Sequence, residues 1–214
     1  MSEIKYRNAE TKDEEAVLQL LRDHFYPDEP LNKSKGSHDK ADEDFAIGTI
    51  KHGLCTIAEV FDASHPDGYI VGCRLSYPSA REDVEAEEPK TSPPTTDFEK
   101  IVAFLGMLEA KSNVFQRFNV EKIAQGHMLS VHKDFRGKGI AKQLYVENIE
   151  LARKLGYPIY VCDCTSLFSA KLCEKLGMEL TATMQFDEFA DANGNAYYQP
   201  PPPHDFARSF ALRL

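Results

Sequence analysis

The stretch from Met128 to Ala141 carries the residue types of an anion-binding turn. Gly137 and Gly139 allow the backbone to approach a ligand closely and to direct several N–H groups the same way, while Arg136 and Lys138 add positive charge. An amphipathic helix is predicted directly after this turn, and its N-terminus contributes about half a unit of positive charge. We therefore predict a cradle for an anion, most naturally for phosphates.

Two common phosphate-binding motifs do not fit this turn. The P-loop pattern Gly-x4-Gly-Lys-[Ser/Thr] is absent, and the dinucleotide-binding fingerprint needs a third glycine where Lys142 stands. One alternative is an ordinary glycine-containing turn between a strand and a helix. The pattern Arg136-x-x-Gly139-x-Ala141, preceded by an apolar strand, instead resembles the pyrophosphate-binding motif of the GNAT acyltransferase superfamily, whose members bind acetyl-CoA. The resemblance implies cofactor contacts from Leu129, Ser130, Val131, Arg136, Gly137, Lys138, Gly139, Ile140 and Ala141.

A second segment, from Tyr160 to Met178, supports the same interpretation. A predicted strand leads to hydroxyl residues and then to a helix ending in Glu174-Lys-Leu-Gly-Met, which resembles the family's frequent E-K-x-G-F ending. The resemblance implies that the cofactor lies along this helix, beside Ser166, Ser169 and Lys171. For Ser166 the alternative is a plain helix N-cap.

The segment Phe25-Tyr-Pro-Asp-Glu-Pro-Leu-Asn32 is similar to the "DEPL" segment of insect arylalkylamine N-acetyltransferases. In that subfamily the glutamate of the segment is the general base, which implies this role for Glu29. The paired serines of the subfamily fall on Thr165 and Ser169, so the first position departs from the pattern. The same resemblance places the neighbours of the base beside the amine: Asp28 and Pro30. The alternative is that Asp28 and Glu29 form a solvated acidic turn.

The proposed base has a demanding task. An alkylamine has a pKa of about 10.4, so only about one molecule in 10³ carries a free lone pair at neutral pH, and removing the proton costs roughly 4 kcal/mol. Partial burial beside Pro27, Pro30 and Leu31 is expected to raise the pKa of Glu29 toward the range where general bases work best.

Other groups are expected to serve the attack of the amine on the thioester. The developing oxyanion needs a donor, and we expect a backbone N–H near Leu129 to supply it. Ser169 or Thr165 is expected to protonate the departing thiolate. The family's C-terminal loop approaches the site, which implies that His204 lines the amine pocket. His127, on the strand before the cofactor turn, is either a proton relay or a satisfied strand-edge histidine.

The five cysteines, at positions 55, 73, 162, 164 and 173, lie in apolar segments and are predicted to be reduced, buried thiols. Cys162 and Cys164 have no adjacent histidine, and their spacing is not that of a zinc finger. We therefore expect core thiols at these positions, rather than an acyl-carrying nucleophile, and no metal site.

The net charge and the apolar content of the chain indicate which kinds of binding partner to expect. The 214 residues contain 25 Lys and Arg against 34 Asp and Glu, a formal charge of −9. This balance disfavours nucleic acid and acidic membranes and favours a cationic substrate. Apolar runs are too short for a transmembrane helix, and the first residues lack the apolar core of a secretory signal. We expect a cytoplasmic monomer.

The elements that must position these residues follow from periodicity. Strands are predicted at 4–7, 54–60, 69–77, 122–131, 158–164, 179–186 and 207–214. Helices are predicted after capping boxes at Thr11 to Glu14 and Thr96 to Glu99, and at 39–52, 140–155 and 166–176. The helix after Thr96 is expected to bury a stripe that ends at Phe115, formed by Phe98, Val102, Leu105, Leu108 and Phe115. Residues 85–95 are predicted to form an exposed loop, and residues 199–203 a stiff connector.

This order of elements predicts a single α/β domain over residues 1–214, a mixed sheet with helices on both faces. The resemblance implies the GNAT fold, with a mostly antiparallel, twisted sheet of about seven strands. The leading hypothesis is an acetyl-CoA-dependent N-acetyltransferase for a small arylalkylamine of the dopamine, tyramine and serotonin class. Alternatives are an aliphatic amine such as agmatine or a polyamine, protein lysine or N-terminal acetylation, and a non-catalytic CoA-binding module.

Overall fold

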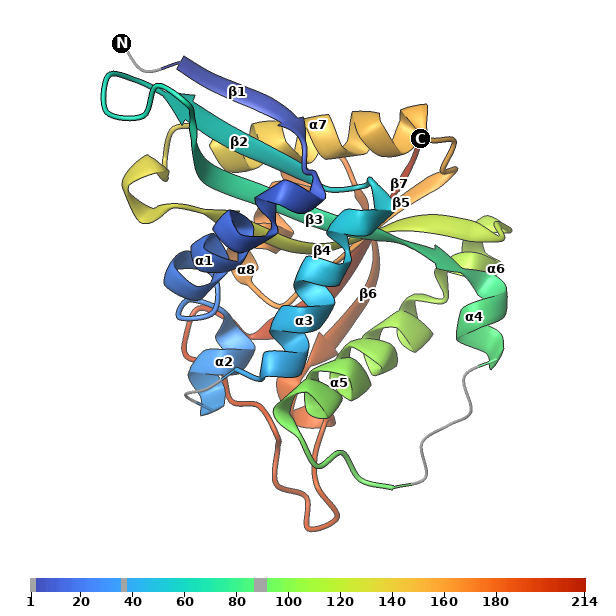
Figure 1. Cartoon of the computed structure of the whole chain (residues 1–214). Helices are drawn as coiled ribbons and strands as arrows, with labels where there is room; N and C mark the ends of the chain where they lie inside the picture. Colours follow the sequence, from blue (N-terminus) through green and yellow to red (C-terminus); the bar gives the residue numbers. More distant parts are fainter. Residues whose placement is uncertain (1–2, 36–37, 87–91) are drawn as a thin grey trace.

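The computed structural model describes residues 3–35, 38–86 and 92–214. Its centre is a seven-stranded sheet with the order β1-β2-β3-β4-β5-β7-β6 (Figure 1). Neighbouring strands are antiparallel except β4 and β5, which are parallel, so the predicted mixed and mostly antiparallel sheet is confirmed. The strands are β1 (Glu3–Asn8), β2 (Thr56–Phe61), β3 (Tyr69–Ala80), β4 (Lys122–Val131), β5 (Ile159–Cys164), β6 (Glu179–Gln185) and β7 (Phe206–Arg213).

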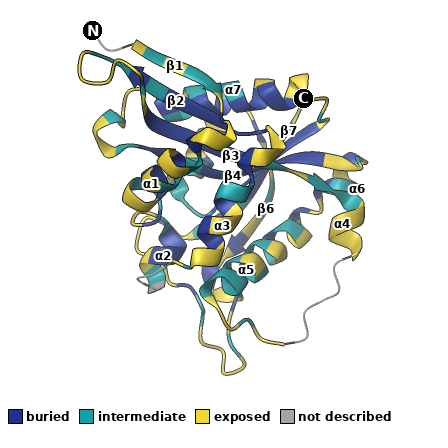
Figure 2. Cartoon of the chain, viewed as in Figure 1, coloured by how far each residue is buried: buried dark blue, intermediate teal, exposed yellow. Residues whose placement is uncertain are grey.

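Helices cover both faces of this sheet (Figure 1). One face carries α1 (Glu14–His24), α3 (Lys40–Gly48) and α5 (Asp97–Ser112), and the other carries α7 (Ile140–Lys154) and α8 (Leu167–Lys175). Shorter helices are α2 (Pro30–Lys35), α4 (Arg81–Ala86) and α6 (Val114–Phe118). The central strands are buried between these layers (Figure 2). Within the part of the chain that is described, no helix is both long and apolar enough to span a membrane.

The capping box before α5 forms as predicted, with Thr96 and Glu99 as its two members. The box predicted at Thr11 is displaced by one residue. Its members are Glu10 and Asp13, which flank a single 3-10 turn before α1 begins. The reason is a tertiary contact: Arg7 of β1 donates two hydrogen bonds to Asp13, at 2.7 and 2.9 Å, and fixes that carboxylate where it also accepts the Glu10 N–H.

The helix after Thr96 is shorter than predicted, and only part of its predicted stripe is buried. It ends at Ser112, and its C-cap Asn113, with a left-handed φ of 47°, separates it from α6. The buried side chains are Phe104, Leu108 and Ser112, whereas Val102 of the predicted stripe is 43% exposed. Phe104 stacks on Phe186 beyond the end of β6, with ring centroids 5.5 Å apart, and this contact sets the orientation of the helix.

The acidic segment predicted to be a loop at 85–95 begins inside α4, and its residues 87–91 lie outside the described residues. The predicted helix at 39–52 is α3 followed by a 3-10 turn over Ile50–His52, and it ends at Gly53 with a φ of 68°, as expected for a left-handed C-cap.

The parallel pair at the centre of the sheet is short. β4 and β5 pair only from Ala124 with Tyr160 to Gly126 with Cys162, and beyond that point the strands separate. On its other side β4 carries a bulge, because Leu75 pairs with Met128 while Ser76 pairs with Gly126, which leaves His127 as the extra residue. Since a bulge bends the strand that contains it, we infer that it turns the end of β4 away from β5 and opens the sheet there.

Candidate active site

A cavity of about 520 Å³ lies where β4 and β5 separate. Side chains from the segment after α1, from both strands, and from the N-terminal ends of α7 and α8 line it. It brings together most of the residues that the sequence singled out: Asp28, Glu29, Pro30, Leu129, Ser130, Val131, Arg136, Ala141, Thr165, Ser166, Ser169 and His204. Five of the predicted cofactor residues do not line the cavity. Gly137, Lys138 and Gly139 lie in the exposed turn before α7, Ile140 is buried in the core, and Lys171 is exposed on α8.

Glu29 is fixed in this cavity by local structure and by one distant contact. It follows Pro27 and Asp28 and immediately precedes α2, and its N–H donates to the carbonyl of Phe25 at 2.9 Å. Thr165 Oγ1 donates to Glu29 Oε1 at 2.7 Å across 136 positions of sequence, and the Leu31 N–H adds a weaker bond at 3.3 Å. Burial raises the pKa of Glu29 above its usual range, and these two hydrogen bonds oppose that rise.

Asp28 lines the cavity and forms ion pairs with two cations. Arg136 Nη1 lies 2.7 Å from its Oδ2, and Lys33 lies 3.2 Å from its Oδ1, so the pKa of Asp28 is lowered chiefly by Arg136. Arg136 also donates to the carbonyls of His24, at 2.8 Å, and Val131, at 2.9 Å. The guanidinium therefore links the cofactor turn to the segment that carries the proposed base, and its role as a phosphate ligand remains a prediction.

The turn between β4 and α7 has the geometry of an anion cradle. Gly137 and Gly139 adopt φ values of 77° and 82°, which other residues rarely reach, and a Cβ atom at either position would face open space. Gly139 is also the N-cap of α7, so the first N–H groups of that helix lie next to the turn. The Lys138 Nζ lies 4.6 Å from the centre of the Phe135 ring.

The opened edge of β4 offers backbone groups to a ligand. His132 N–H donates to the Val71 carbonyl on β3, so by the alternation of a strand the N–H and C=O groups of Leu129 and Val131 point to the opposite edge, toward the gap. The Val131 carbonyl already accepts a hydrogen bond from Arg136. An extended chain with amide groups, such as the pantetheine arm of coenzyme A, fits beside Leu129, and the cradle fits its diphosphate.

The hydroxyl residues of the α8 segment have distinct partners. Ser166 Oγ accepts the Phe168 N–H at 3.1 Å and is the N-cap of α8, so this alternative for Ser166 is confirmed. Ser169 Oγ donates to the Ser166 carbonyl at 2.9 Å and lines the cavity. His204 is buried, and its Nδ1 accepts the Leu167 N–H at 3.2 Å, which places its ring against the start of the same helix.

Several groups in or near the cavity were not predicted from the sequence. Arg74 of β3 and Tyr145 of α7 line its floor, and Asp163 of β5 lines its wall. His127, which the sequence analysis left as either a proton relay or a satisfied strand-edge histidine, also lines the cavity. Its Nε2 is buried without a hydrogen-bond partner among the described residues, so it is not a satisfied histidine. Burial, with the charge of Arg74, lowers the pKa of His127 to about 4, so its ring is neutral at physiological pH. The sequence signal that could have identified Arg74 is that it is a lone arginine inside the apolar strand 69–77.

Two carboxyl groups lie deeper in the structure. Asp163 Oδ2 accepts a hydrogen bond from Gln125 Nε2 at 2.8 Å, while its Oδ1 is buried and without a partner among the described residues; burial raises the pKa of Asp163. Gln125 also lines a second cavity of about 1170 Å³ between α5 and the sheet. Asp42 of α3 is buried, and desolvation, with the charge of Glu29, raises its pKa to about 7.

Comparison with known proteins identifies the family of this chain and structures with a similar fold. A sequence model described as the acetyltransferase (GNAT) family matches residues 57–178. The chain is similar to the structure of a Drosophila melanogaster polyamine N-acetyltransferase, an enzyme that catalyses the formation of N-acetylagmatine, with 29% identity, a TM-score of 0.88, and coverage of 99% of this chain and 100% of that one. It is equally similar to a mosquito arylalkylamine N-acetyltransferase-like 5b, with 28% identity, a TM-score of 0.88 and coverage of 99% and 100%. Arylalkylamine N-acetyltransferase 2 of Aedes aegypti follows with 27% identity, a TM-score of 0.82 and 98% of both chains.

Proposed function

Because the chain belongs to the GNAT acetyltransferase family, we propose that it transfers the acetyl group of acetyl-CoA to the primary amine of a small arylalkylamine, with Glu29 as general base. The observation that carries the proposal is the half-buried Glu29 carboxylate, held by Thr165 at 2.7 Å beside the gap between β4 and β5. Members of the family use acetyl-CoA, which supplies an activated acetyl thioester.

Each part of the cavity has a task in this proposal. The turn at Gly137 and Gly139, with the N-terminus of α7, holds the diphosphate of the cofactor. The backbone of Leu129 at the open edge orients the cofactor arm and donates to the carbonyl oxygen of the thioester. Ser169, which lines the cavity near the start of α8, supplies a proton to the departing thiolate, and coenzyme A leaves as the thiol.

Glu29 takes the proton of the amine, directly or through a water molecule. Its raised pKa makes it a stronger base than an exposed glutamate, and the Thr165 hydroxyl keeps the carboxylate oriented. Thr165 thus serves the base in this proposal, whereas the sequence suggested it as a proton donor to the thiolate.

An aromatic wall supports an arylalkylamine. Phe45 of α3 is 41% exposed, and its ring centroid lies 5.1 Å from that of His127, which lines the cavity. The ring centroids of Tyr77 and Phe98 lie 5.4 and 6.0 Å from that of Phe45. These rings lie on the sheet face opposite α7, so an amine approaching past them would meet the thioester from the side away from the cofactor helix.

A second candidate substrate is an aliphatic amine such as agmatine. Asp163 favours it, because the unpartnered Oδ1 of this buried carboxyl group offers an acceptor for a distal guanidinium or ammonium group. The similarity to the Drosophila enzyme that forms N-acetylagmatine supports the same alternative.

The test is acetyl-CoA turnover with tyramine, agmatine and a lysine-containing peptide. We expect tyramine to be the best substrate, and Glu29→Gln to lower kcat by about 10²–10⁴-fold. Glu15→Gln is the matched control, because Glu15 is exposed on α1 and does not line the cavity, and it should retain most of the activity. Unchanged kcat/KM for Glu29→Gln at neutral pH would remove Glu29 as the base, and acetyl-CoA binding without turnover of any amine would indicate a non-catalytic module.

A further inference from the structure

Arg74 is a buried cation with an unusual set of partners. It lies on β3 with 1% of its surface exposed, and its Nε donates to the Tyr160 hydroxyl at 2.9 Å while the guanidinium lies 4.3 Å from the centre of the Tyr145 ring. Among the described residues, no carboxylate forms an ion pair with it. A guanidinium stays protonated in proteins, and a buried charge is costly unless a counter-charge lies close by.

The most acidic group within hydrogen-bond distance of Arg74 is a thiol, which can carry that counter-charge. Arg74 Nη2 donates to Cys162 Sγ at 3.3 Å, and the Tyr145 hydroxyl lies 2.9 Å from the same sulfur. Cys162 is therefore placed to exist as a thiolate that receives hydrogen bonds from a cation and a phenol.

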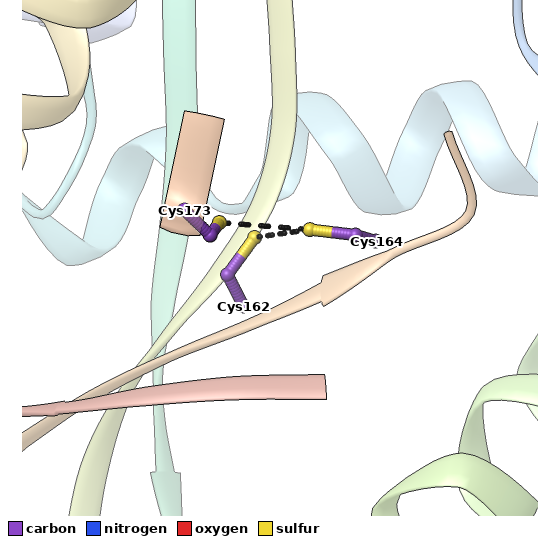
Figure 3. A group of neighbouring side chains, drawn as sticks. All are labelled: Cys162, Cys164 and Cys173. Carbon is purple, nitrogen blue, oxygen red and sulfur yellow. Dashed lines mark hydrogen bonds between the residues drawn. The ribbon is translucent and has the colours of Figure 1, made fainter. Parts of the chain in front are cut away.

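Two further thiols surround Cys162 (Figure 3). Cys164 Sγ lies 3.7 Å from Cys162 Sγ and 3.6 Å from Cys173 Sγ, and all three sulfur atoms lie within 4.8 Å of one another. Hydrogen bonds from Cys164 and Cys173, together with the charge of Arg74, hold the pKa of Cys162 well below its usual range. Cys55 and Cys73 differ, because burial raises the pKa of both.

Cys162 is 2% exposed, but its side chain borders the 520 Å³ cavity, as do those of Arg74, Tyr145 and Ser169. The cavity therefore offers small reagents a route to this sulfur. Cys164 and Cys173 do not line the cavity, so a reagent that enters it meets Cys162 first.

We propose that Cys162 is a reactive thiolate and a modification site for small electrophiles, above all hydroperoxides, and that Cys173 converts the oxidised residue to a disulfide. The thiolate attacks the terminal oxygen of the hydroperoxide, the O–O bond breaks, hydroxyl is transferred to sulfur, and the departing alkoxide takes a proton from water. The Cys173 sulfur then attacks the Cys162 sulfur, the S–O bond breaks, and hydroxide leaves with the proton of Cys173 as water. Two thiols are oxidised and one hydroperoxide is reduced to an alcohol.

Geometry favours Cys173 over Cys164 as the partner. Cys162 and Cys164 are two residues apart on one strand, which separates their Cα atoms by about 6.6–6.8 Å, the upper end of what a disulfide spans. Cys173 comes from α8, and the Tyr145 hydroxyl contacts both its sulfur, at 3.4 Å, and that of Cys162. Oxidation would leave Arg74 without its counter-charge beneath the site.

The first experiment labels the wild-type protein with iodoacetamide and maps the modified peptides. Cys162 should react at least tenfold faster than Cys55 and Cys73, the internal controls, and its rate should rise far less steeply with pH than that of an ordinary thiol. Acetyl-CoA should slow the labelling. Equal rates for the three residues, or a rate at Cys162 that rises about tenfold per pH unit as for an ordinary thiol, would overturn the proposal.

The second experiment treats the protein with tert-butyl hydroperoxide and follows intact mass and non-reduced peptides. The wild type should lose two hydrogen atoms and yield a peptide that links Cys162 to Cys173, and a thiol reductant should reverse the change. Cys173→Ala should instead accumulate a sulfenic acid at Cys162 that dimedone traps, and Cys162→Ala should show neither product. Stoichiometric zinc in the purified protein would overturn the proposal, because the three thiols would then be metal ligands. These readouts do not depend on turnover of any amine.

Discussion

The hydrogen bond between Thr165 and Glu29 allows a quantitative test of the proposed base. Thr165→Val keeps the size of the side chain but removes the hydroxyl that donates to Glu29 Oε1 at 2.7 Å. A hydrogen bond to a charged group contributes about 1.5–3 kcal/mol, and one pKa unit corresponds to about 1.4 kcal/mol. Because the lost bond stabilises the carboxylate, the pKa of Glu29 should rise by a further ~1–2 units in the variant.

The base acts as the carboxylate, so the rise moves the acidic limb of the pH–rate profile to higher pH. We expect the limb of kcat for tyramine, measured by thiol release at saturating acetyl-CoA, to shift upward by about 1–2 units in Thr165→Val. Below the limb the variant should be roughly 10–100 times slower than the wild type, and above it the rates should converge. The ionisation of the amine is the same in assays of the wild type and of Thr165→Val, so a difference between their profiles reports the ionisation of Glu29.

Thr165→Ser is the matched control, because it retains a hydroxyl and should leave the limb in place. A Thr165→Val variant that is slower by the same factor at every pH would refute the reasoning and indicate that Thr165 acts on the departing thiol. A limb that persists unchanged in Glu29→Gln would show that another group titrates.

Two further predictions follow from the cradle and from a buried acid. Gly139→Trp should weaken acetyl-CoA binding about tenfold or more in calorimetric titration and leave the KM of the amine unchanged. Gly194→Trp, at another left-handed glycine, is the control and should change neither quantity. Equal losses of affinity for both ligands in Gly139→Trp would indicate that the turn is purely structural. The pKa of Asp42 is raised to about 7, so the folded state holds this proton more tightly than the unfolded chain, and stability is lost as the pH rises toward that value. Asp42→Asn should therefore increase the free energy of unfolding in urea by about 2–4 kcal/mol at about pH 8.5, with a smaller gain at about pH 5; an equal gain at both would contradict the assignment.

The sequence predicted those elements whose signals are local. β4, α7, β5 and α8 begin and end within one or two residues of the predicted bounds, because each has its own apolar pattern, and because Gly139 and Ser166 mark the starts of the two helices. The same holds for the cradle, since the left-handed conformations of Gly137 and Gly139 are properties of those residues themselves.

The rest depended on contacts between distant positions. Arg136 and Asp28 are 108 residues apart, and nothing in either segment indicates that one neutralises the other. Val102 was assigned to the buried stripe, but the side of α5 that packs is chosen by the rings near β6, and the amphipathic pattern of the helix alone does not distinguish the two faces. The sequence predicted an ordinary core thiol at Cys162, because its cationic neighbour Arg74 lies on a strand 88 positions earlier and is not visible in the local pattern.

The short parallel contact between β4 and β5 divides the sheet into two antiparallel halves. One half is β1-β2-β3-β4 and the other is β5-β7-β6, and between the strands that join them only three residue pairs are in register. This seam has the fewest paired residues of any strand contact in the described sheet, and the 520 Å³ cavity opens along it. Amide hydrogen exchange should therefore be fastest at the two strand ends that face each other there, and a cofactor arm that bridges them would act as an eighth strand segment that ties the halves together.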